Sequence, residues 1–476
     1  MVIMNKNKFN KLKQKASDLF NRTIDQHVTL AVTGLSRSGK TAFITSLVNQ
    51  LLNEGNRSQL SFFDVSHQGR YIAAKRVPQK NLHIARFEYD AALDALCNDP
   101  PSWPEPTHGI SQLRIAIRYQ PKSSLLKYAT DTATLFLDIT DYPGEWLLDL
   151  PMLNQTYEEW SRSTLKLMLQ PPRQEKAQAL IDKISAIDPF AEASEQLLAD
   201  LAAEYTELLH YFRHELGLSV IQPGRFILPG ELADAPILQF IPFTGFDNID
   251  ANAYQNASDD SLVGMLRARF VEYKERVVRK FYKEHFVHFD RQIVLADCLK
   301  PLNVGPASFA DLQLAINLIM ESFSYGQSSL FSRLFSPKID KLLFAATKAD
   351  HVTPEQHGNL VSLLNQLIYQ TKHVLNYETI EMKTVAIAAV KTTQAGKSLH
   401  KGKLLPVLKG RRASDDKTIT VFPGSVPAKL PEENFWQDNT FNYIDFSPPE
   451  GGNRQESLPH IRLDQVMQFL LGDKML

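Results

Sequence analysis

Short apolar runs alternate along most of this chain with longer stretches that carry an apolar residue at every third or fourth position. The short runs predict β-strands at residues 28–33, 60–65, 113–119, 132–139, 291–299, 341–346 and 383–389. The longer spacing predicts helices at residues 42–52, 309–323, 354–372 and 461–471. Strands that alternate with helices indicate an α/β fold, with a predominantly parallel sheet flanked by helices.

Two parts of the chain depart from this alternation. Residues 147–284 carry mostly helical patterns, with one irregular or strand-like island near residues 237–243, and they predict a large helical insertion. Its predicted helices span residues 156–169, 177–187, 192–216 and 260–285. Residues 1–26 place apolar positions at helical spacing beside many lysines, which predicts a basic amphipathic helix. Such a helix either lies on an anionic membrane surface or docks on its own domain.

Composition narrows the class of protein. The chain has 476 residues, 43% of them hydrophobic and 22% charged, which is enough for several domains around a sizeable core. A net charge of −1 gives no reason to expect nucleic acid as a partner, and two cysteines imply no disulfide framework. The longest apolar runs fall far short of the roughly 20 residues of a spanning helix, and no signal peptide is visible. We therefore expect a cytoplasmic protein.

The first predicted strand runs directly into Gly34-Leu35-Ser36-Arg37-Ser38-Gly39-Lys40-Thr41, which fits the pattern G-x-x-x-x-G-K-[ST]. Backbone N–H groups of such a loop curl round a phosphate, and the following helix adds the positive end of its dipole. Lys40 is expected to reach the β- and γ-phosphates of a nucleotide, and Thr41 to offer its hydroxyl to Mg²⁺. The expected phosphate-binding residues are Gly34, Ser36, Arg37, Ser38, Gly39, Lys40, Thr41 and Ala42.

A second motif, Asp141-Tyr142-Pro143-Gly144, follows the strand predicted at residues 132–139. Downstream of a phosphate loop, D-x-x-G predicts that Asp141 holds Mg²⁺ and that the Gly144 N–H senses a γ-phosphate. Thr107 ends a proline-rich segment just ahead of the strand predicted at residues 113–119. It is expected to be a further Mg²⁺ ligand that closes on the γ-phosphate, with Ser111 as the alternative.

A third motif, Thr347-Lys348-Ala349-Asp350, resembles the [NT]-K-x-D motif of GTPases. The Asp350 carboxylate can accept from two neighbouring donors of guanine that adenine lacks, and the Lys348 stem can lie along the base. Ala388, Ala389 and Val390 stand where GTPases carry a turn whose backbone contacts the guanine oxygen, although its usual serine is missing. These residues predict GTP or GDP as the ligand, with Mg²⁺ as the cofactor.

Two residues bear on hydrolysis. Glu145 stands where many Ras-like proteins have a glutamine that orients the attacking water, so the usual water-positioning residue is missing from this motif. The phosphate loop is similar to that of guanylate-binding proteins, in which an arginine at the place of Arg37 acts as an arginine finger in cis. Arg37 either stabilises transition-state charge in this way or pairs with an acid such as Glu105 or Glu145. The candidate catalytic residues are Lys40, Arg37, Thr107 and Gly144.

The motif order is that of Ras-like GTPases, and nearly the whole chain resembles the YcjX-like family of bacterial stress-associated GTP-binding proteins. The resemblance rests on GLSRSGKT, on Trp103-Pro104 with Thr107, on DITDYPGEWLLDLPML, on TKAD and on AVKTT. It implies a Ras-like P-loop core with a helical insertion, binding of Mg-GTP and Mg-GDP, and a link to the envelope stress response.

These expectations divide the chain into six parts. They are a basic helix (1–26), the first part of the nucleotide domain (27–146), the helical insertion (147–284), the second part of the nucleotide domain (285–390), a basic loop (391–430), and a C-terminal segment that returns with a final helix (431–476). We expect a slow Mg-dependent GTPase that acts as a switch, with the insertion as its surface for a protein effector. A nucleotide-binding scaffold with negligible turnover and an ATPase are the alternatives. The sequence is compatible with a homodimer and with peripheral contact of a basic stretch with the inner membrane.

Overall fold

The computed structural model describes residues 25–476 except for Ser36, His108, Lys401, Glu433 and the ranges 55–58, 123–130, 325–338, 373–379 and 439–442. Two expectations therefore lie outside the described residues: the phosphate contact of Ser36 and nearly all of the amphipathic helix at 1–26. Among the described residues, no helix combines the length and the apolar character that crossing a membrane requires.

An eight-stranded sheet, in the order β2-β4-β5-β1-β6-β7-β8 with β3 beside β4, forms the centre of the molecule. Strand β1 (Gln26–Gly34) is parallel to β5 (Ala133–Asp141) on one side and to β6 (Arg291–Ala296) on the other. The parallel half continues through β7 (Lys341–Ala346) and β8 (Glu381–Ala386). Antiparallel pairing joins β5 to β4 (Ser111–Tyr119) and β4 to β2 (Tyr71–Val77), and the short β3 (Ala85–Arg86) is parallel to β4. The predicted fold class, a predominantly parallel α/β sheet flanked by helices, is confirmed.

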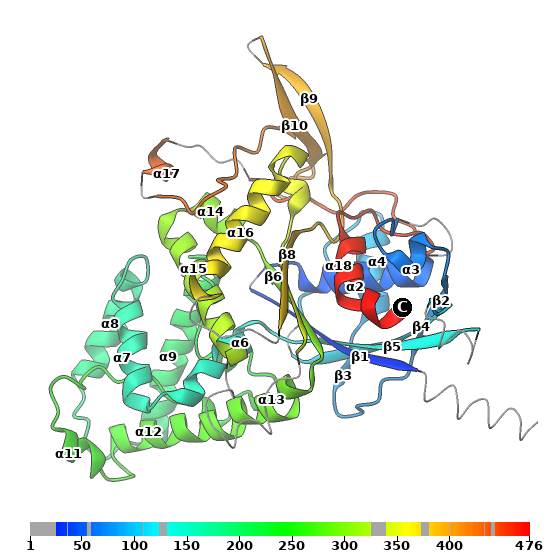
Figure 1. Ribbon diagram of the computed structural model, residues 1–476. Helices are drawn as coiled ribbons and strands as arrows, with labels where there is room; N and C mark the ends of the chain where they lie inside the picture. The colour runs from blue at the N-terminus through cyan, green and yellow to red at the C-terminus, as the bar shows by residue number, and fades with distance from the viewer. Residues whose placement is uncertain are drawn as a thin grey trace, which may run out of the picture.

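Helices cover both faces of this sheet (Figure 1). Successive residues of a strand point to opposite faces, so Leu30 joins one apolar core and Ala31 joins the other. The Leu30 core includes residues of α2 (Lys40–Asn53), α4 (Tyr89–Cys97) and α18 (Leu463–Leu471). The Ala31 core includes residues of α14 (Leu299–Val304), α15 (Pro306–Ser324) and α16 (His357–Lys372).

The predicted insertion between β5 and β6 is helical and extends away from α18 to one side of the sheet (Figure 1). Its helices are α6 (Glu145–Leu148), α7 (Tyr157–Met168), α8 (Gln174–Ser185), α9 (Glu195–His214), α10 (Gly224–Ile227), α11 (Ala251–Gln255), α12 (Leu262–Glu272), a π-helical turn at Tyr273–Val278 and α13 (Arg279–Glu284). The island near residues 237–243 is irregular after a 3₁₀ turn, Pro236–Leu238. Trp160 and Phe240 of the insertion belong to the same apolar core as Ala31 of the sheet, so the insertion and this face of the sheet share one interior.

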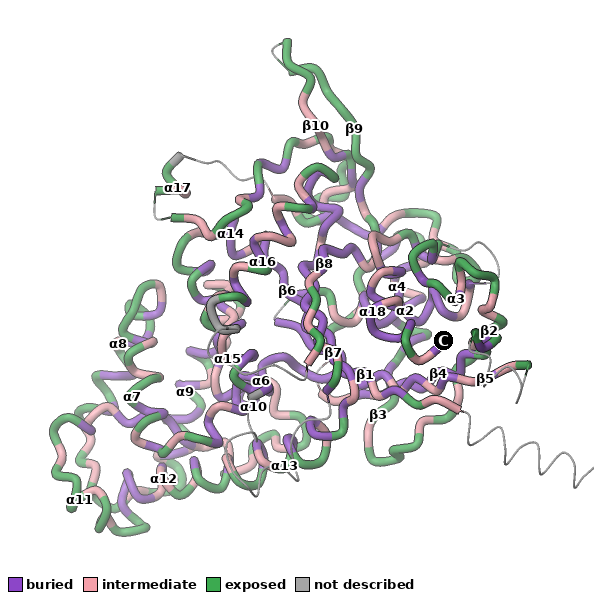
Figure 2. Tube along the Cα trace, viewed as in Figure 1, coloured by how far each residue is buried: buried purple, intermediate pink, exposed green. Residues whose placement is uncertain are grey.

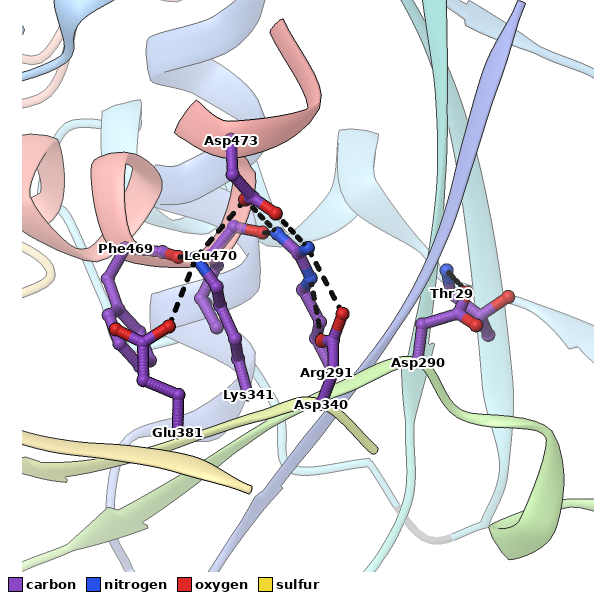
Figure 3. A network of polar contacts seen from close by, with 9 residues as sticks. All are labelled: Thr29, Asp290, Arg291, Asp340, Lys341, Glu381, Phe469, Leu470 and Asp473. Carbon is purple, nitrogen blue, oxygen red and sulfur yellow. Dashed lines mark hydrogen bonds and ion pairs between the residues drawn. The ribbon is translucent and has the colours of Figure 1, made fainter. Parts of the chain in front are cut away.

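The C-terminal end of the chain is fastened to the sheet by a buried arginine (Figure 3). Arg291, fully buried at the start of β6, pairs with Asp473 at 2.6 Å and with Asp340 at 3.2 Å. Lys341 at the start of β7 reaches Asp473 as well, at 3.2 Å. Burial by itself raises the pKa of Asp473, but Arg291 and Lys341 outweigh it and leave that pKa below its ordinary value. These contacts hold the turn after α18 against the starts of two strands.

Three local predictions are wrong or incomplete. Residues 60–65 form no strand but a turn that leads into α3 (Asp64–His67), and the edge strand β2 was not foreseen. The stretch 391–430 is not a loop: β9 (Thr393–His400), β10 (Lys403–Arg411) and β11 (Thr418–Val421) form an antiparallel sheet. The β9–β10 hairpin projects from the body of the protein and is largely exposed (Figures 1 and 2). Helix α17 (Phe435–Asp438) follows it.

Candidate nucleotide-binding site

A cavity of about 530 Å³ lies where β1, β7 and β8 end, and the residues that follow those three strands line it. Crevices at the carboxyl ends of parallel strands are the usual ligand sites of such sheets. The cavity is lined by five basic side chains, Arg37, Lys40, Arg213, Lys300 and Lys348, and by three acidic ones, Glu145, Asp350 and Asp445. This excess of positive charge suits an anionic ligand.

The phosphate loop connects β1 to α2 through residues with left-handed backbone, Arg37 at φ 62° and Gly39 at φ 79°. A Cβ added to Gly34 would lie 2.1 Å from the Ser38 hydroxyl oxygen, so any other residue here would displace the Ser38 side chain. A Cβ on Gly144 would lie 2.3 Å from the Gly34 carbonyl oxygen. The backbone of the D-x-x-G motif therefore rests directly on the phosphate loop, as sensing of a γ-phosphate by Gly144 would require.

Two contacts connect the residues predicted to hold Mg²⁺ to the phosphate loop, one from Asp141 to Lys40 and one from Thr107 to Thr41. Lys40 Nζ is 2.5 Å from Asp141 Oδ1, and the hydroxyl oxygens of Thr41 and Thr107 are 3.5 Å apart. Asp141 is buried, and within the described part of the chain its Oδ2 has no hydrogen-bond partner. A buried carboxylate oxygen without a partner and two neighbouring hydroxyls are hard oxygen donors of the kind that Mg²⁺ prefers. Ser111, the alternative to Thr107, is buried at the start of β4 opposite Asp141. Thr107 lines the cavity, whereas Ser111, Asp141 and Gly144 do not.

The residues predicted to read the base line another part of the same cavity, from Thr347 and Asp350 to Ala388, Ala389 and Val390. The backbone N–H and hydroxyl of Thr392 donate to Asp350 Oδ2 at 2.7 and 2.6 Å and fix this carboxylate. Thr392 thus supplies a hydroxyl close to the turn that lacks the usual serine. A threonine shortly after that turn was the only sequence signal for this role.

Lys348 is held by two further acids that sequence reasoning missed. Its Nζ lies 2.9 Å from Asp297 and 2.9 Å from Asp445, and its backbone is left-handed at φ 58°. Burial alone would lower the pKa of Lys348, but the two carboxylates raise it above its ordinary value. The lysine therefore stays charged while its stem lines the cavity.

The two residues that bear on hydrolysis differ in exposure and in ion pairing: Glu145 is buried and paired, and Arg37 is exposed. Glu145 is buried and forms an ion pair with Arg213 of α9, with Oε1 and Nη2 2.9 Å apart. Arg37 is exposed, and no ion pair joins it to another residue of the described chain, so it does not pair with Glu105 or Glu145 there. Burial and then the charge of Arg37 lower the pKa of Lys300, which also lines the cavity. No sequence motif pointed to Arg213 or Lys300.

The insertion contacts the segment after Gly144 tightly. Gln222 Nε2 donates to the Leu148 carbonyl oxygen at 2.6 Å, and the guanidinium of Arg225 lies 3.4 Å from the centre of the Trp146 ring. A Cβ on Gly224 would lie 2.5 Å from the Glu145 carbonyl oxygen, so only glycine allows this approach. Helix α6, the first helix of the insertion, thus lies between the phosphate loop and the later part of the insertion around Gly224.

Asp149, just after α6, joins the same contact. The Gly224 N–H donates to its carboxylate at 2.9 Å, and the Tyr273 hydroxyl donates to it at 2.5 Å. Burial raises the pKa of Asp149 to about 7, although both hydrogen bonds act in the opposite direction.

Comparisons with known proteins agree with this geometry. The model of the YcjX-like family, DUF463, matches residues 28–475. The chain is 50% identical over 465 residues to a protein of Escherichia coli strain K12 named Ras-like GTPase YcjX, covering 98% of this chain and 99% of that protein. It is 44% identical over 476 residues to a protein of the same name from Shewanella oneidensis strain MR-1, covering 98% of each. The resemblance inferred from the motifs is confirmed.

Proposed function

This chain belongs to the YcjX-like family of Ras-like GTPases, and from that premise we propose that it hydrolyses Mg-GTP slowly to GDP and phosphate and acts as a nucleotide-state switch. The observation that carries the proposal is the cavity itself. At one part of it Lys40 and Thr41 lie with Thr107, and at another Asp350 is oriented by Thr392. A phosphate chain and a guanine need these two sets of groups within one site.

In the proposed reaction, Lys40 and the loop N–H groups bind the β- and γ-phosphates. Thr41, Thr107 and Asp141 would hold Mg²⁺, which when bound neutralises charge on the phosphate oxygens. Arg37 stabilises the negative charge of the transition state, and the exposure of its side chain without an ion pair to any other described residue supports this role. Turnover is slow because the γ-phosphate repels the carboxylate of Glu145, which therefore orients no attacking water in the place of the usual glutamine.

Phosphate release from the purified protein tests this function. We expect GTP turnover on the order of 10⁻⁴–10⁻² s⁻¹, as for GTPases without an activating partner, and little release from ATP. Lys40→Ala should abolish release, and Arg37→Ala should reduce turnover by more than it reduces GTP affinity. Lys183→Ala, at an exposed ion pair between α8 and α9, is the matched control. Binding of GDP without any GTP turnover would favour the scaffold, and faster release from ATP would favour an ATPase.

We also propose that the insertion, residues 147–284, passes the nucleotide state to a protein effector. Its contacts with α6 support this, because any movement of Gly144 must displace α6 against Gly224 and Gln222. The link to the envelope stress response rests on the family resemblance alone.

For the contact with an anionic membrane we propose the β9–β10 hairpin. Leu399 and Leu404 are cross-strand partners near its tip and are 72% and 61% exposed. Lys397 shares their face, and the sequence has no acidic residue from 391 to 414. Two exposed aliphatic side chains within a purely basic segment complement an anionic lipid surface.

A further inference from the structure

The long helix α9 brings an arginine from the insertion into the nucleotide cavity. It runs from Glu195 to His214, and Arg213 in its last turn lines the same cavity as Arg37 and Lys40. The charge of Arg37 also helps to lower the pKa of the neighbouring His214, after burial and the charges of Arg213 and His210. The end of α9 and the phosphate loop therefore face each other.

The partner of Arg213 is the residue that directly follows the γ-phosphate sensor. Glu145 is adjacent to Gly144, and its ion pair with Arg213 is nearly enclosed, with side chains 6% and 16% exposed. Water screens such a pair less than a surface pair, so its charges act strongly on what enters beside them. A γ-phosphate reaching Gly144 brings negative charge close to the Glu145 carboxylate and repels it. It also offers Arg213 a phosphate oxygen, which a guanidinium binds with paired hydrogen bonds.

We propose that Arg213 exchanges partners with the nucleotide state: it binds Glu145 when no γ-phosphate is present and binds the γ-phosphate when GTP is present. This inference rests on the proposed function and adds to it a second arginine at the phosphates. It assigns Glu145 a role that glutamine could not fill, because only a carboxylate neutralises Arg213 until GTP arrives. The end of α9, and with it the insertion, then reads the γ-phosphate directly as well as through α6.

Equilibrium binding of fluorescent GDP and of a non-hydrolysable GTP analogue tests the exchange. Arg213→Ala should weaken binding of the analogue by about tenfold, the size of a lost charge-assisted hydrogen bond, and change GDP binding by less than about twofold. Glu145→Gln should act in the opposite direction and tighten binding of the analogue by roughly threefold or more, because Arg213 then no longer has to leave a carboxylate. Arg213→Lys should lie between wild type and Arg213→Ala, since lysine keeps the charge but not the planar fork.

Arg276→Ala is the matched control, because Arg276 forms an exposed pair with Glu272 elsewhere in the insertion and should leave both affinities unchanged. Equal effects of Arg213→Ala on GDP and analogue, or no effect on either, would overturn the exchange while leaving the GTPase proposal intact. Wild-type protein that binds neither ligand would instead overturn the proposed function. If circular dichroism shows that Arg213→Ala does not fold, Arg213→Lys and Glu145→Gln decide: unchanged selectivity for the analogue in both overturns the exchange.

Discussion

Titration of the Asp149 carboxyl should make the stability of this protein depend on pH. Its pKa is raised by burial to about 7, whereas in the unfolded chain it titrates near its ordinary value of 3.8. Between these values the folded protein holds a proton that the unfolded chain has lost. The free energy of unfolding therefore decreases as pH rises from about 4 to 7, by up to about 4 kcal/mol from this group, and levels off above it.

Asp149→Asn should remove this contribution, because an amide does not titrate. We expect the urea midpoint of the variant, relative to that of wild type, to shift upward between pH 5 and pH 7.5. Asp182→Asn, at an exposed position of α8, controls for loss of a carboxylate and should follow wild type. Parallel pH profiles for wild type and Asp149→Asn would mean that Asp149 is ionised throughout the range.

Residues inside short motifs were predictable because their neighbours in sequence are also their neighbours in space. Lys40 begins the helix after the first predicted strand, and Asp141 ends the strand predicted at residues 132–139. Arg213 was not predictable, because only the path of α9 through the folded insertion brings it to Glu145. Asp445 reaches Lys348 across almost a hundred residues, again without a local pattern.

At the scale of the elements, the β9–β10 hairpin is predicted to bind anionic membranes. Replacing Leu399 and Leu404 together by serine should reduce binding to vesicles that contain phosphatidylglycerol, and replacing Lys397 and Lys403 by glutamate should reduce it further. Each basic residue near such a surface contributes about 1 kcal/mol, or roughly fivefold in affinity. Co-sedimentation with these vesicles and with neutral phosphatidylcholine vesicles measures the effect.

Leu82→Ser is the matched control for the hairpin, since Leu82 is 85% exposed on a loop before β3. Wild-type protein that stays in the supernatant with both vesicles would contradict the membrane contact, and binding to acidic proteins alone would assign the hairpin to another partner.

Some elements are buried or exposed because of contacts with distant parts of the chain. They were harder to predict than elements whose apolar residues recur with the period of a helix or a strand. Phe63 is buried within the core that α2 and α18 share, so the apolar run at 60–65 resembled a strand while forming a turn. Both faces of β2 are exposed for much of its length, so no alternation marked it. In residues 391–417 the lysines indicated a solvated loop, but Gly402, at φ 75°, lies at the turn between two antiparallel strands.

At the scale of the whole molecule, amide hydrogen exchange of the GDP-bound and GTP-bound states tests whether the insertion responds to the γ-phosphate. With a GTP analogue in place of GDP, we expect altered exchange in α6, in the last turn of α9 and around residues 222–225, because these segments contact Glu145 or Gly144. Helix α4, on the opposite face of the sheet, is the internal control. Identical exchange across 147–284 in both states would exclude the insertion as the output, and Lys40→Ala should show no difference between ligands.

The place of the insertion between β5 and β6 also has a consequence for synthesis of the chain. Strand β1 has β5 on one edge and β6 on the other, so its second edge stays unpaired until the ribosome has passed the insertion. The roughly 150 residues from β5 to β6 take about 8 to 30 s to translate at ordinary rates. Throughout that interval the nascent chain carries an open, apolar strand edge of the kind that aggregates. The protein should therefore depend on chaperones during translation, before it has bound any nucleotide.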